Sequence, residues 1–328
     1  MLSLMISLTS NIAKTDSYNS LIEIIDAESE HFYKNLGFPN EIFISIENHQ
    51  KDKKNKWKNM VFYGDFFGAK MVTVFFPKKA SLIDDRSDAI RNTHKHTLFV
   101  PSCEFLMWYE VFALTTYSYD RFLSKKEEKS YSLYIPSNYK KQVEEKVPLI
   151  EAIIRSRDII NQPPTDTRPE AFVEYISSFQ WKNFKLKVID AKELKKLGCN
   201  LLLAVGAGSD YPPYMVILER VFDSKKDTYA LIGKWVTFDA GWLQIKPDTA
   251  MLDMKCDMSW AAGMLGVAEY LDSFDTLPVN VVVGLGITEN VINGKAFKPL
   301  DIYKAYNGTT VEIFNCVIIK YSMEVTLT

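Results

Sequence analysis

Several features that would assign this chain to a protein class are scarce in its sequence. The 328 residues hold four cysteines. No two of them form a Cys-x-x-Cys pair, so we expect free thiols in a reducing compartment rather than a disulfide framework. No apolar stretch approaches the ~20 residues of a membrane-spanning helix. The formal net charge of −2 gives no reason to expect nucleic acid or an anionic membrane surface as a partner. These absences predict a soluble, cytoplasmic protein.

The chain is long enough for two domains, each with its own core. Hydrophobic residues make up 47% of the sequence, and a domain typically holds ~150 residues. Residues 1–14 lack the basic start and long apolar core of a signal peptide, so they predict a first strand. Further short apolar runs at 42–46 and 69–76 predict strands between lysine-rich loops. We place the domain boundary near residue 145, which gives domains 1–145 and 146–328.

The second part of the chain alternates predicted helices and strands. A helix is expected to end at Asn161, before two prolines. Another should open with Thr167 as N-cap and Pro169 in its first turn, and a third should run from the cap Asp190 to Gly198. A long helix is expected at 259–271. The predicted strands are 184–189, 201–205, 214–218, 229–236 and 279–283. Because these strands are continuously apolar, they predict a parallel sheet covered on both faces, as in doubly wound α/β domains.

Four charged residues lie close together around one predicted strand end. Lys234 and Asp239 bracket the end of strand 229–236, Lys246 lies on the following loop, and Asp257 precedes the helix at 259–271. Ligand groups of α/β sheets collect where strands end, so all four side chains could face one crevice. Carboxylate oxygens bind hard divalent cations, and a deprotonated lysine amine can join them. A second, charged lysine could polarise a substrate carbonyl.

The sequence around these residues resembles the leucyl aminopeptidase family, the dinuclear cytosolic aminopeptidases. The family blocks Gly-Lys-Gly, Thr-Phe-Asp-Ser-Gly-Gly, Lys-Pro and Met-Lys-x-Asp-Met-Gly-Gly-Ala-Ala correspond here to GKW, TFDAGW, IKP and MKCDMSWAA. Further blocks at 156–164, 201–219 and 277–302 match in the same order. The resemblance covers residues from about 110 to 315.

The resemblance implies a fold, a reaction and a set of site residues. The fold would be an N-terminal macro-like mixed α/β domain followed by a doubly wound, metallo-exopeptidase-like catalytic domain. Lys234, Asp239 and Asp257 would be ligands of two divalent ions, Mn²⁺ or Zn²⁺, with Asp239 bridging them. Lys246 would be the catalytic lysine, and Met254 would line the pocket for the first side chain. The reaction would be hydrolysis of N-terminal residues from peptides, and the assembly a homo-hexamer.

The sequence departs from the family pattern after residue 315. There the family continues into Thr-Asp-Ala-Glu-Gly-Arg, which supplies two carboxylate ligands and an arginine. Here Val-Glu-Ile-Phe-Asn is followed by Cys-Val-Ile-Ile-Lys-Tyr. We therefore expect a truncated catalytic domain that lacks half of the metal site, with weak binding of at least one ion, impaired hydrolysis and a hexamer in doubt. The alternative is a catalytically inactive relic, or a binding or structural paralogue, on the same fold.

Three family glycines are tryptophans in this chain. They are Trp235, Trp242 and Trp260, and all three flank the charged residues. Glycine permits a positive φ and a close approach of backbones, which tryptophan does not permit without strain. The substitutions therefore predict strained backbone at these positions and suggest relaxed selection on the site.

Overall fold

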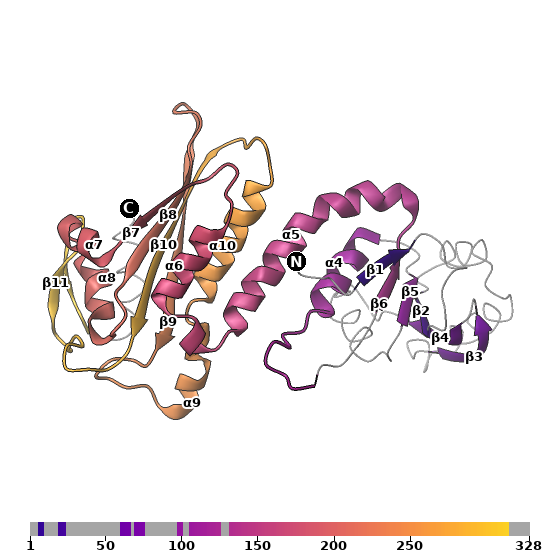
Figure 1. Ribbon diagram of the computed structural model, residues 1–328, viewed down its shortest axis with the longest axis horizontal. Coiled ribbons are helices and arrows are strands. Elements are labelled where there is room, and N and C mark those ends of the chain that lie inside the picture. The colour runs from indigo at the N-terminus through magenta and orange to yellow at the C-terminus, as the bar shows by residue number, and fades with distance from the viewer. Residues whose placement is uncertain are drawn as a thin grey trace, which may run out of the picture. The chain divides into compact units, whose positions relative to one another are not determined.

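A computed structural model describes two compact units of the chain, Met1–Ile150 and Glu151–Thr328 (Figure 1). The described residues are 6–9, 19–23, 60–66, 69–75, 97–100, 105–125 and 131–314. The predicted strand at 42–46 and the residues after 314 lie outside these ranges. The division of the chain into domains 1–145 and 146–328 stays a prediction.

The first unit contains a six-stranded sheet in the order β1-β6-β5-β2-β4-β3. Its strands are β1 (Ile6–Thr9), β2 (Asn19–Glu23), β3 (Met60–Phe66), β4 (Ala69–Phe75), β5 (Thr97–Val100) and β6 (Tyr131–Tyr134). Neighbouring strands are parallel except β3 and β4. The predicted strands at 1–14 and 69–76 are confirmed as β1 and β4. Helix α4 (Phe105–Thr115) also belongs to this unit, which is therefore mixed α/β.

Helix α5 (Lys140–Asn161) is longer than the sequence pattern predicted. It ends at Asn161, as expected from the prolines that follow. Its start lies eight residues before Pro148, although proline lacks an N–H and usually marks a helix start. The described ranges also contain the short 3-10 helices η2 (Ser137–Tyr139), η3 (Pro164–Asp166) and η4 (Gly206–Gly208). Every helix in the described ranges is too short or too polar to span a lipid bilayer.

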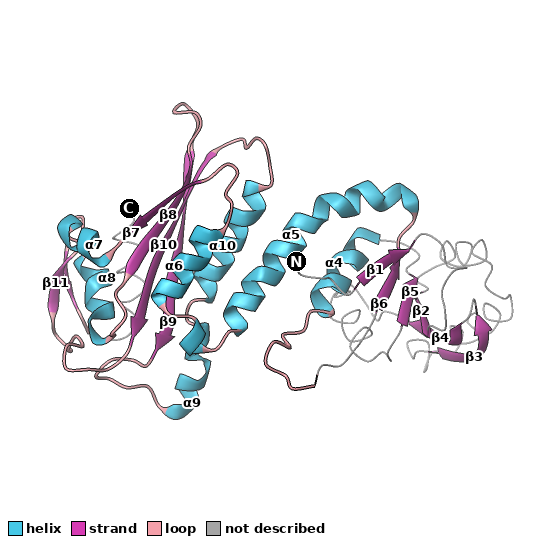
Figure 2. Ribbon diagram, viewed as in Figure 1, coloured by secondary structure: helices cyan, strands magenta, loops and turns pink. Residues whose placement is uncertain are grey.

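The second unit is built on a four-stranded sheet in the order β7-β8-β10-β9 (Figure 2). The strands are β7 (Lys185–Ile189), β8 (Tyr214–Arg220), β9 (Thr228–Asp239) and β10 (Asn280–Asn290). Only β9 and β10 are parallel, while β8 runs antiparallel to both β10 and β7. The prediction of a parallel sheet was therefore wrong for two of its three strand pairings, both of which involve the reversed strand β8. An apolar run reports burial on two faces and carries no information about strand direction.

Helices cover both faces of this sheet. Helices α6 (Pro169–Ser178) and α10 (Ser259–Asp272) pack on one face, against alternate strand residues such as Val216 and Leu218. Helices α7 (Ala191–Leu197) and α8 (Asn200–Val205) pack on the other face, against Met215 and Ile217. The unit is therefore the doubly wound α/β layer expected from the sequence.

Two local predictions about helices were wrong. Residues 201–205, predicted as a strand, form helix α8, because a five-residue apolar run fits either structure and periodicity cannot separate them. Thr167 does not cap α6, whose N-cap is Arg168; the Thr167 hydroxyl instead donates to the carbonyls of Pro163 and Pro164.

The predicted ends of α7 are confirmed. The Asp190 side chain accepts a hydrogen bond from the Glu193 N–H at the start of the helix. Gly198 ends it at a φ of 78°, a left-handed conformation that glycine adopts without a steric penalty. Cys199, which follows, is a buried free thiol, and Cys256 is a partly buried one.

A small subdomain completes the described part of the second unit. Strands β11 (Ile302–Lys304) and β12 (Thr310–Glu312) form an antiparallel pair. Between β9 and α10, the chain forms the short helices α9 (Asp248–Met251) and η5 (Leu252–Cys256). These short helices stand beside the carboxyl end of β9 and carry part of the candidate site.

Candidate functional site

The five residues expected from the sequence to form a site lie around the carboxyl-terminal half of β9. Lys234 is inside the strand, Asp239 is its last residue, and Lys246 is on the loop that follows. Met254 belongs to η5, and Asp257 comes directly after it. Because β9 ends beside α9 and η5, the fold brings these residues together from one continuous stretch of chain.

Lys234 and Asp257 form an ion pair. The Lys234 Nζ donates to both carboxylate oxygens of Asp257, at 2.6 and 2.7 Å. Their side chains are 23% and 21% exposed, so a ligand from solvent can reach them. Gly233 makes the pair possible: a Cβ there would lie 2.8 Å from the Ala261 Cα. The close approach of β9 to the first turn of α10 thus places Asp257 next to Lys234.

Asp239 and Lys246 form a second, more deeply buried ion pair. The Lys246 Nζ lies 2.6 Å from one Asp239 oxygen and 2.7 Å from the Met254 Sδ. The other Asp239 oxygen accepts a hydrogen bond from the Gly241 N–H. Gly241 has a φ of 89°, and a Cβ there would lie 2.7 Å from the Gln244 carbonyl oxygen. This tight turn folds Lys246 back onto the aspartate seven residues before it.

The sequence reasoning missed one residue of this cluster, Asn290. Its Nδ2 donates to Asp239 at 2.6 Å, and its carbonyl oxygen accepts from the Ala240 N–H. The signal was present in the sequence, since Asn290 ends the apolar strand beside β9. Parallel strands bring their carboxyl ends to one edge of the sheet. In the ladder, Asn290 is the register partner of Asp239.

The two ion pairs act on each other electrostatically. Burial raises the pKa of the Asp257 carboxyl above its usual value, and the Lys234 ammonium only partly offsets this. Asp239 raises it further, while Lys246 lowers it. The Asp257 carboxylate is thus incompletely compensated by its protein partners. A further positive charge beside it would be favourable.

The donors in this cluster fit part of the metal site that the resemblance implies. Asp239, Asp257 and a deprotonated Lys234 amine offer three donor groups. The Asn290 Oδ1, buried and without a hydrogen-bond partner among the described residues, is a further oxygen beside Asp239. Residues 131–314 and the other described ranges contain no group of three or more His, Cys, Asp and Glu side chains that could hold an ion. The cluster itself supplies two carboxylates, those of Asp239 and Asp257.

The three tryptophans near the site occupy different environments. Trp235 is buried in the extended strand β9 and packs against Phe172, with ring centroids 4.2 Å apart. Trp242 is buried at a φ of 55° and stacks on Phe297 at 4.5 Å. Trp260 is 65% exposed on α10 and donates to the Ile232 carbonyl. Positive φ therefore occurs at one of the three positions, so the expectation of strained backbone was wrong for Trp235 and Trp260.

Comparisons with known proteins place this site in a family. The sequence profile of the cytosol aminopeptidase family, catalytic domain, matches residues 154–316, which include the whole cluster. A probable cytosol aminopeptidase of Agrobacterium fabrum is 35% identical over 213 residues, which is 62% of this chain. The chain spans 43% of that relative's length.

Solved structures share the fold. The leucine aminopeptidase of Caenorhabditis elegans superposes with a TM-score of 0.75 at 23% identity, covering 98% of this chain and 70% of that one. The bottromycin maturation enzyme BotP, in a complex with Mn, gives a TM-score of 0.72 at 23% identity, covering 95% of this chain and 67% of that one. Because the family profile and the curated relative agree and these structures have the same fold, the chain belongs to the cytosol aminopeptidase family.

Proposed function

We propose that this chain is a leucyl aminopeptidase-type metallopeptidase chain that acts on the N-terminal residues of peptides and whose metal site is impaired. The observation that carries the proposal is the pairing of Lys234 with Asp257 and of Lys246 with Asp239 at the end of β9. The two pairs hold two candidate ligand carboxylates and a candidate catalytic lysine within one cluster. The family membership supports a peptide as the substrate.

Each residue of the cluster has a distinct proposed role. Lys234, Asp239 and Asp257 would hold a divalent ion, Mn²⁺ or Zn²⁺, and the family expectation is two such ions. When bound, the ion supplies Lewis-acid polarisation of the scissile carbonyl and activation of a water. The Lys246 ammonium, which contacts the Met254 sulfur and would leave Asp239 when an ion binds there, would donate to the carbonyl oxygen as negative charge develops on it. Met254 would contact the first side chain of the peptide.

The charge balance of the cluster supports impaired metal binding. Both carboxylates already have a lysine partner, so an arriving cation must displace Lys234 and Lys246 from them. Lys234 must also lose its proton before its amine can be a ligand. Two carboxylates bind a hard cation less tightly than the larger oxygen sets that such ions prefer. Weak occupancy, and hence slow turnover, follows from this ligand set.

A leucine p-nitroanilide assay with added Mn²⁺ or Zn²⁺ tests the proposal. We expect slow turnover that depends on the metal and falls by about a hundredfold or more in Lys246→Ala and Asp257→Ala. The matched control is Lys255→Ala. Lys255 lies two residues before Asp257 in the sequence, but its ammonium donates to the Asn161 carbonyl instead of a cluster carboxylate. Turnover that is unchanged in both site variants would contradict the proposed roles.

The same charge balance favours a second candidate, a catalytically inactive relic or a binding or structural paralogue. Two lysines and two aspartates neutralise each other without a metal, so the cluster can stabilise the fold by itself. Equilibrium dialysis separates the candidates. Less than one bound ion per chain with no turnover favours the inactive chain, and metal-dependent turnover removes it.

The compartment and assembly follow from the family. The curated relative is named a cytosol aminopeptidase, which supports a cytoplasmic location for this chain. The resemblance to the family favours a homo-hexamer. The departure of the sequence from the family pattern after residue 315 favours a smaller species. Sedimentation analysis of the purified chain distinguishes the hexamer from smaller species.

A further inference from the structure

A pocket of about 450 Å³ lies at the end of the second unit's sheet opposite the Lys–Asp cluster. In Figure 1, α9 marks the end of the sheet that holds the cluster, and the β8–β9 connection marks the other end. The pocket is lined there by the end of β8, the start of β7 and the loop after α10. Its volume falls within the ~300–1,000 Å³ typical of small-molecule sites.

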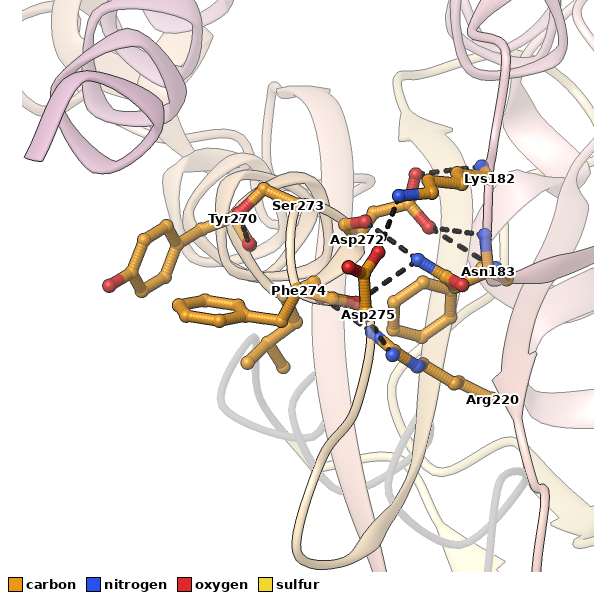
Figure 3. A network of polar contacts seen from close by, with 10 residues as sticks. Lys182, Asn183, Arg220, Tyr270, Asp272, Ser273, Phe274 and Asp275 are labelled. Carbon is orange, nitrogen blue, oxygen red and sulfur yellow. Dashed lines mark hydrogen bonds and ion pairs between the residues drawn. The ribbon is translucent and has the colours of Figure 1, made fainter. Parts of the chain in front are cut away.

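One wall of the pocket is fixed by bonds to the end of α10 (Figure 3). The Asp272 carboxylate accepts from the backbone N–H groups of Lys182 and Asn183, at 2.8 and 2.7 Å. The Asn183 side chain donates to the carbonyls of Asp272 and Phe274. These bonds join the chain before β7 to the carboxyl end of α10. The wall is therefore already formed in the absence of a ligand.

Another part of the lining, the loop between β8 and β9, is held by a buried asparagine. The Asn280 Oδ1 accepts from the N–H groups of Phe222 and Asp223. Its Nδ2 donates to the carbonyls of Asp223 and Lys226. Asn280 is almost fully buried, so these bonds are shielded from water. Phe222 and Lys226 are consequently held at the rim of the pocket.

Arg220 places a buried positive charge in the pocket lining. It is 5% exposed, and its two terminal nitrogens donate to the carbonyls of Leu271 and Phe274, at 2.6 and 2.7 Å. A guanidinium has five N–H donors. Within residues 131–314 and the other described ranges, the Nε–H makes no hydrogen bond and Arg220 is in no ion pair. The two carbonyls compensate part of this charge, and an anion beside the Nε–H would compensate more of it.

The other charges of the lining leave a positive excess. Lys185 and Lys226 also line the pocket, together with the carboxylates of Glu219 and Asp275. Asp275 is paired with Lys182 outside the lining and is 85% exposed. The Lys182 contact, and to a smaller degree the Arg220 charge, lower the pKa of that carboxyl. Three cations and two carboxylates thus line the pocket; Asp275 is paired with Lys182, and the Lys226 ammonium also donates to the Leu277 carbonyl.

We propose that this pocket binds a small amphiphilic oxyanion, with its carboxylate or phosphate group on Arg220, Lys185 and Lys226. The apolar part would pack against Phe222 and Leu277, which also line the pocket. Lys226 already lies 4.6 Å from the Phe222 ring centroid, so a cation and an apolar face stand side by side. The proposal is independent of the metal site and of peptide hydrolysis.

Ligand-observed NMR or calorimetry on the full chain without added metal tests this site. The probes are hexanoate, hexyl phosphate, inorganic phosphate and the neutral control hexanamide. We expect dissociation constants of about 1 mM for the first two and at least about tenfold weaker binding of hexanamide. Tighter binding of hexyl phosphate than of hexanoate assigns the site to phosphate ligands, and the reverse order assigns it to carboxylates. Equal affinity of hexanoate and hexanamide overturns the proposal, as does no binding of either anionic probe at about 10 mM.

Variants locate the binding on the pocket. Arg220 also holds the end of α10, so its removal could unfold the chain. The double variant Lys185→Gln/Lys226→Gln avoids this and should weaken binding of the anionic probe about tenfold or more. The control is Lys192→Gln/Lys195→Gln on α7, which removes the same charge from exposed positions outside the lining. Equal weakening in both double variants would mean that net charge alone attracts the probe, and this too overturns the proposal.

Discussion

The two ends of the second unit's sheet use charged residues in different ways. At the carboxyl end of β9, lysines meet aspartates side chain to side chain, in the pairs Lys234–Asp257 and Lys246–Asp239. At the other end, Asp272 and Arg220 bond to the main chain of neighbouring segments. A side-chain pair can exchange one partner for a metal ion without breaking the backbone framework. Main-chain bonds cannot be exchanged in this way, so the first end is suited to chemistry and the second to holding the fold.

The largest loss of stability is expected from Asp272→Ala, at the end of the sheet held by main-chain bonds. The change removes the acceptor of three backbone N–H groups, those of Lys182, Asn183 and Phe184. Buried donors left without a partner should lower the free energy of unfolding by about 3–5 kcal/mol. Urea denaturation followed by tryptophan fluorescence measures this. The control is Asp275→Ala, an exposed ion-pair partner expected to cost less than about 1 kcal/mol. Similar losses in both variants would show that the main-chain bonds of Asp272 contribute no more to stability than the exposed side-chain pair at the same end of the sheet.

The next effect is expected from Asp239→Ala at the cluster end. The change leaves Lys246 and the Asn290 amide without their common partner, at an expected cost of about 2–4 kcal/mol. Asp257→Ala should cost only about 1 kcal/mol, because Lys234 is partly exposed and water can solvate its ammonium. The same urea titrations compare the two. If Asp257→Ala is the more destabilising variant, then the more deeply buried ion pair is not the one that contributes more to stability.

A smaller, pH-dependent effect is expected at Glu269, in the last turn of α10. Burial raises the pKa of Glu269 above its usual 4.5, and Arg155 only partly offsets this. The folded chain therefore keeps the proton over a pH range in which the unfolded chain loses it. This stabilising contribution is complete below pH 4.5 and is lost as the pH rises through the folded-state pKa.

In Glu269→Gln this titration is absent, so the free energy of unfolding should fall less between pH 4.5 and neutral pH than in the wild type. Urea titrations across that range provide the measurement. Ser273→Ala, which removes an exposed hydroxyl that does not titrate from the end of the same helix, should keep the wild-type slope. A slope in Glu269→Gln equal to that of the wild type would show that this residue contributes nothing to the pH dependence.

The smallest effect is expected from Trp260→Phe. The change keeps an aromatic ring at an exposed position and removes one hydrogen bond, to the Ile232 carbonyl. Its net cost should be about 1 kcal/mol or less. Differential scanning calorimetry should record a shift of a few degrees at most. A loss above about 3 kcal/mol would show that this exposed bond stabilises the fold as much as the buried bonds of Asp272 are expected to.

The juxtaposition of the charged residues in the cluster could be predicted from the sequence because one stretch of chain supplies them, whereas their roles stay a prediction. The turn at Gly241 and the short helices α9 and η5 return Lys246 and Asp257 to strand partners 7 and 23 residues earlier in the chain. Asn290 comes from another strand, and its contact with Asp239 depends on the register of β10 against β9. Local spacing carries no information about that register, so this partner was missed.

Local sequence patterns also could not predict the direction of strand β8 or the environments of the three tryptophans. The antiparallel placement of β8 depends on which strands become neighbours in the sheet. Trp235 fits a strand because its ring finds space against Phe172, on a helix some sixty residues earlier in the chain. Long-range packing of this kind decides whether a large side chain in place of glycine is strained or accommodated.

The bonds along α10 have a mechanical consequence for the cluster. The helix is held in its last turn by Arg220 and by the Arg155–Glu269 pair, and near its start by the bond from Ser156 to the Ala262 carbonyl. A helix restrained near both of its ends has little freedom to shift against the sheet. Asp257, just before its first turn, therefore has little freedom to shift with the backbone. An arriving cation must be accommodated by the swing of the Lys234 and Lys246 side chains.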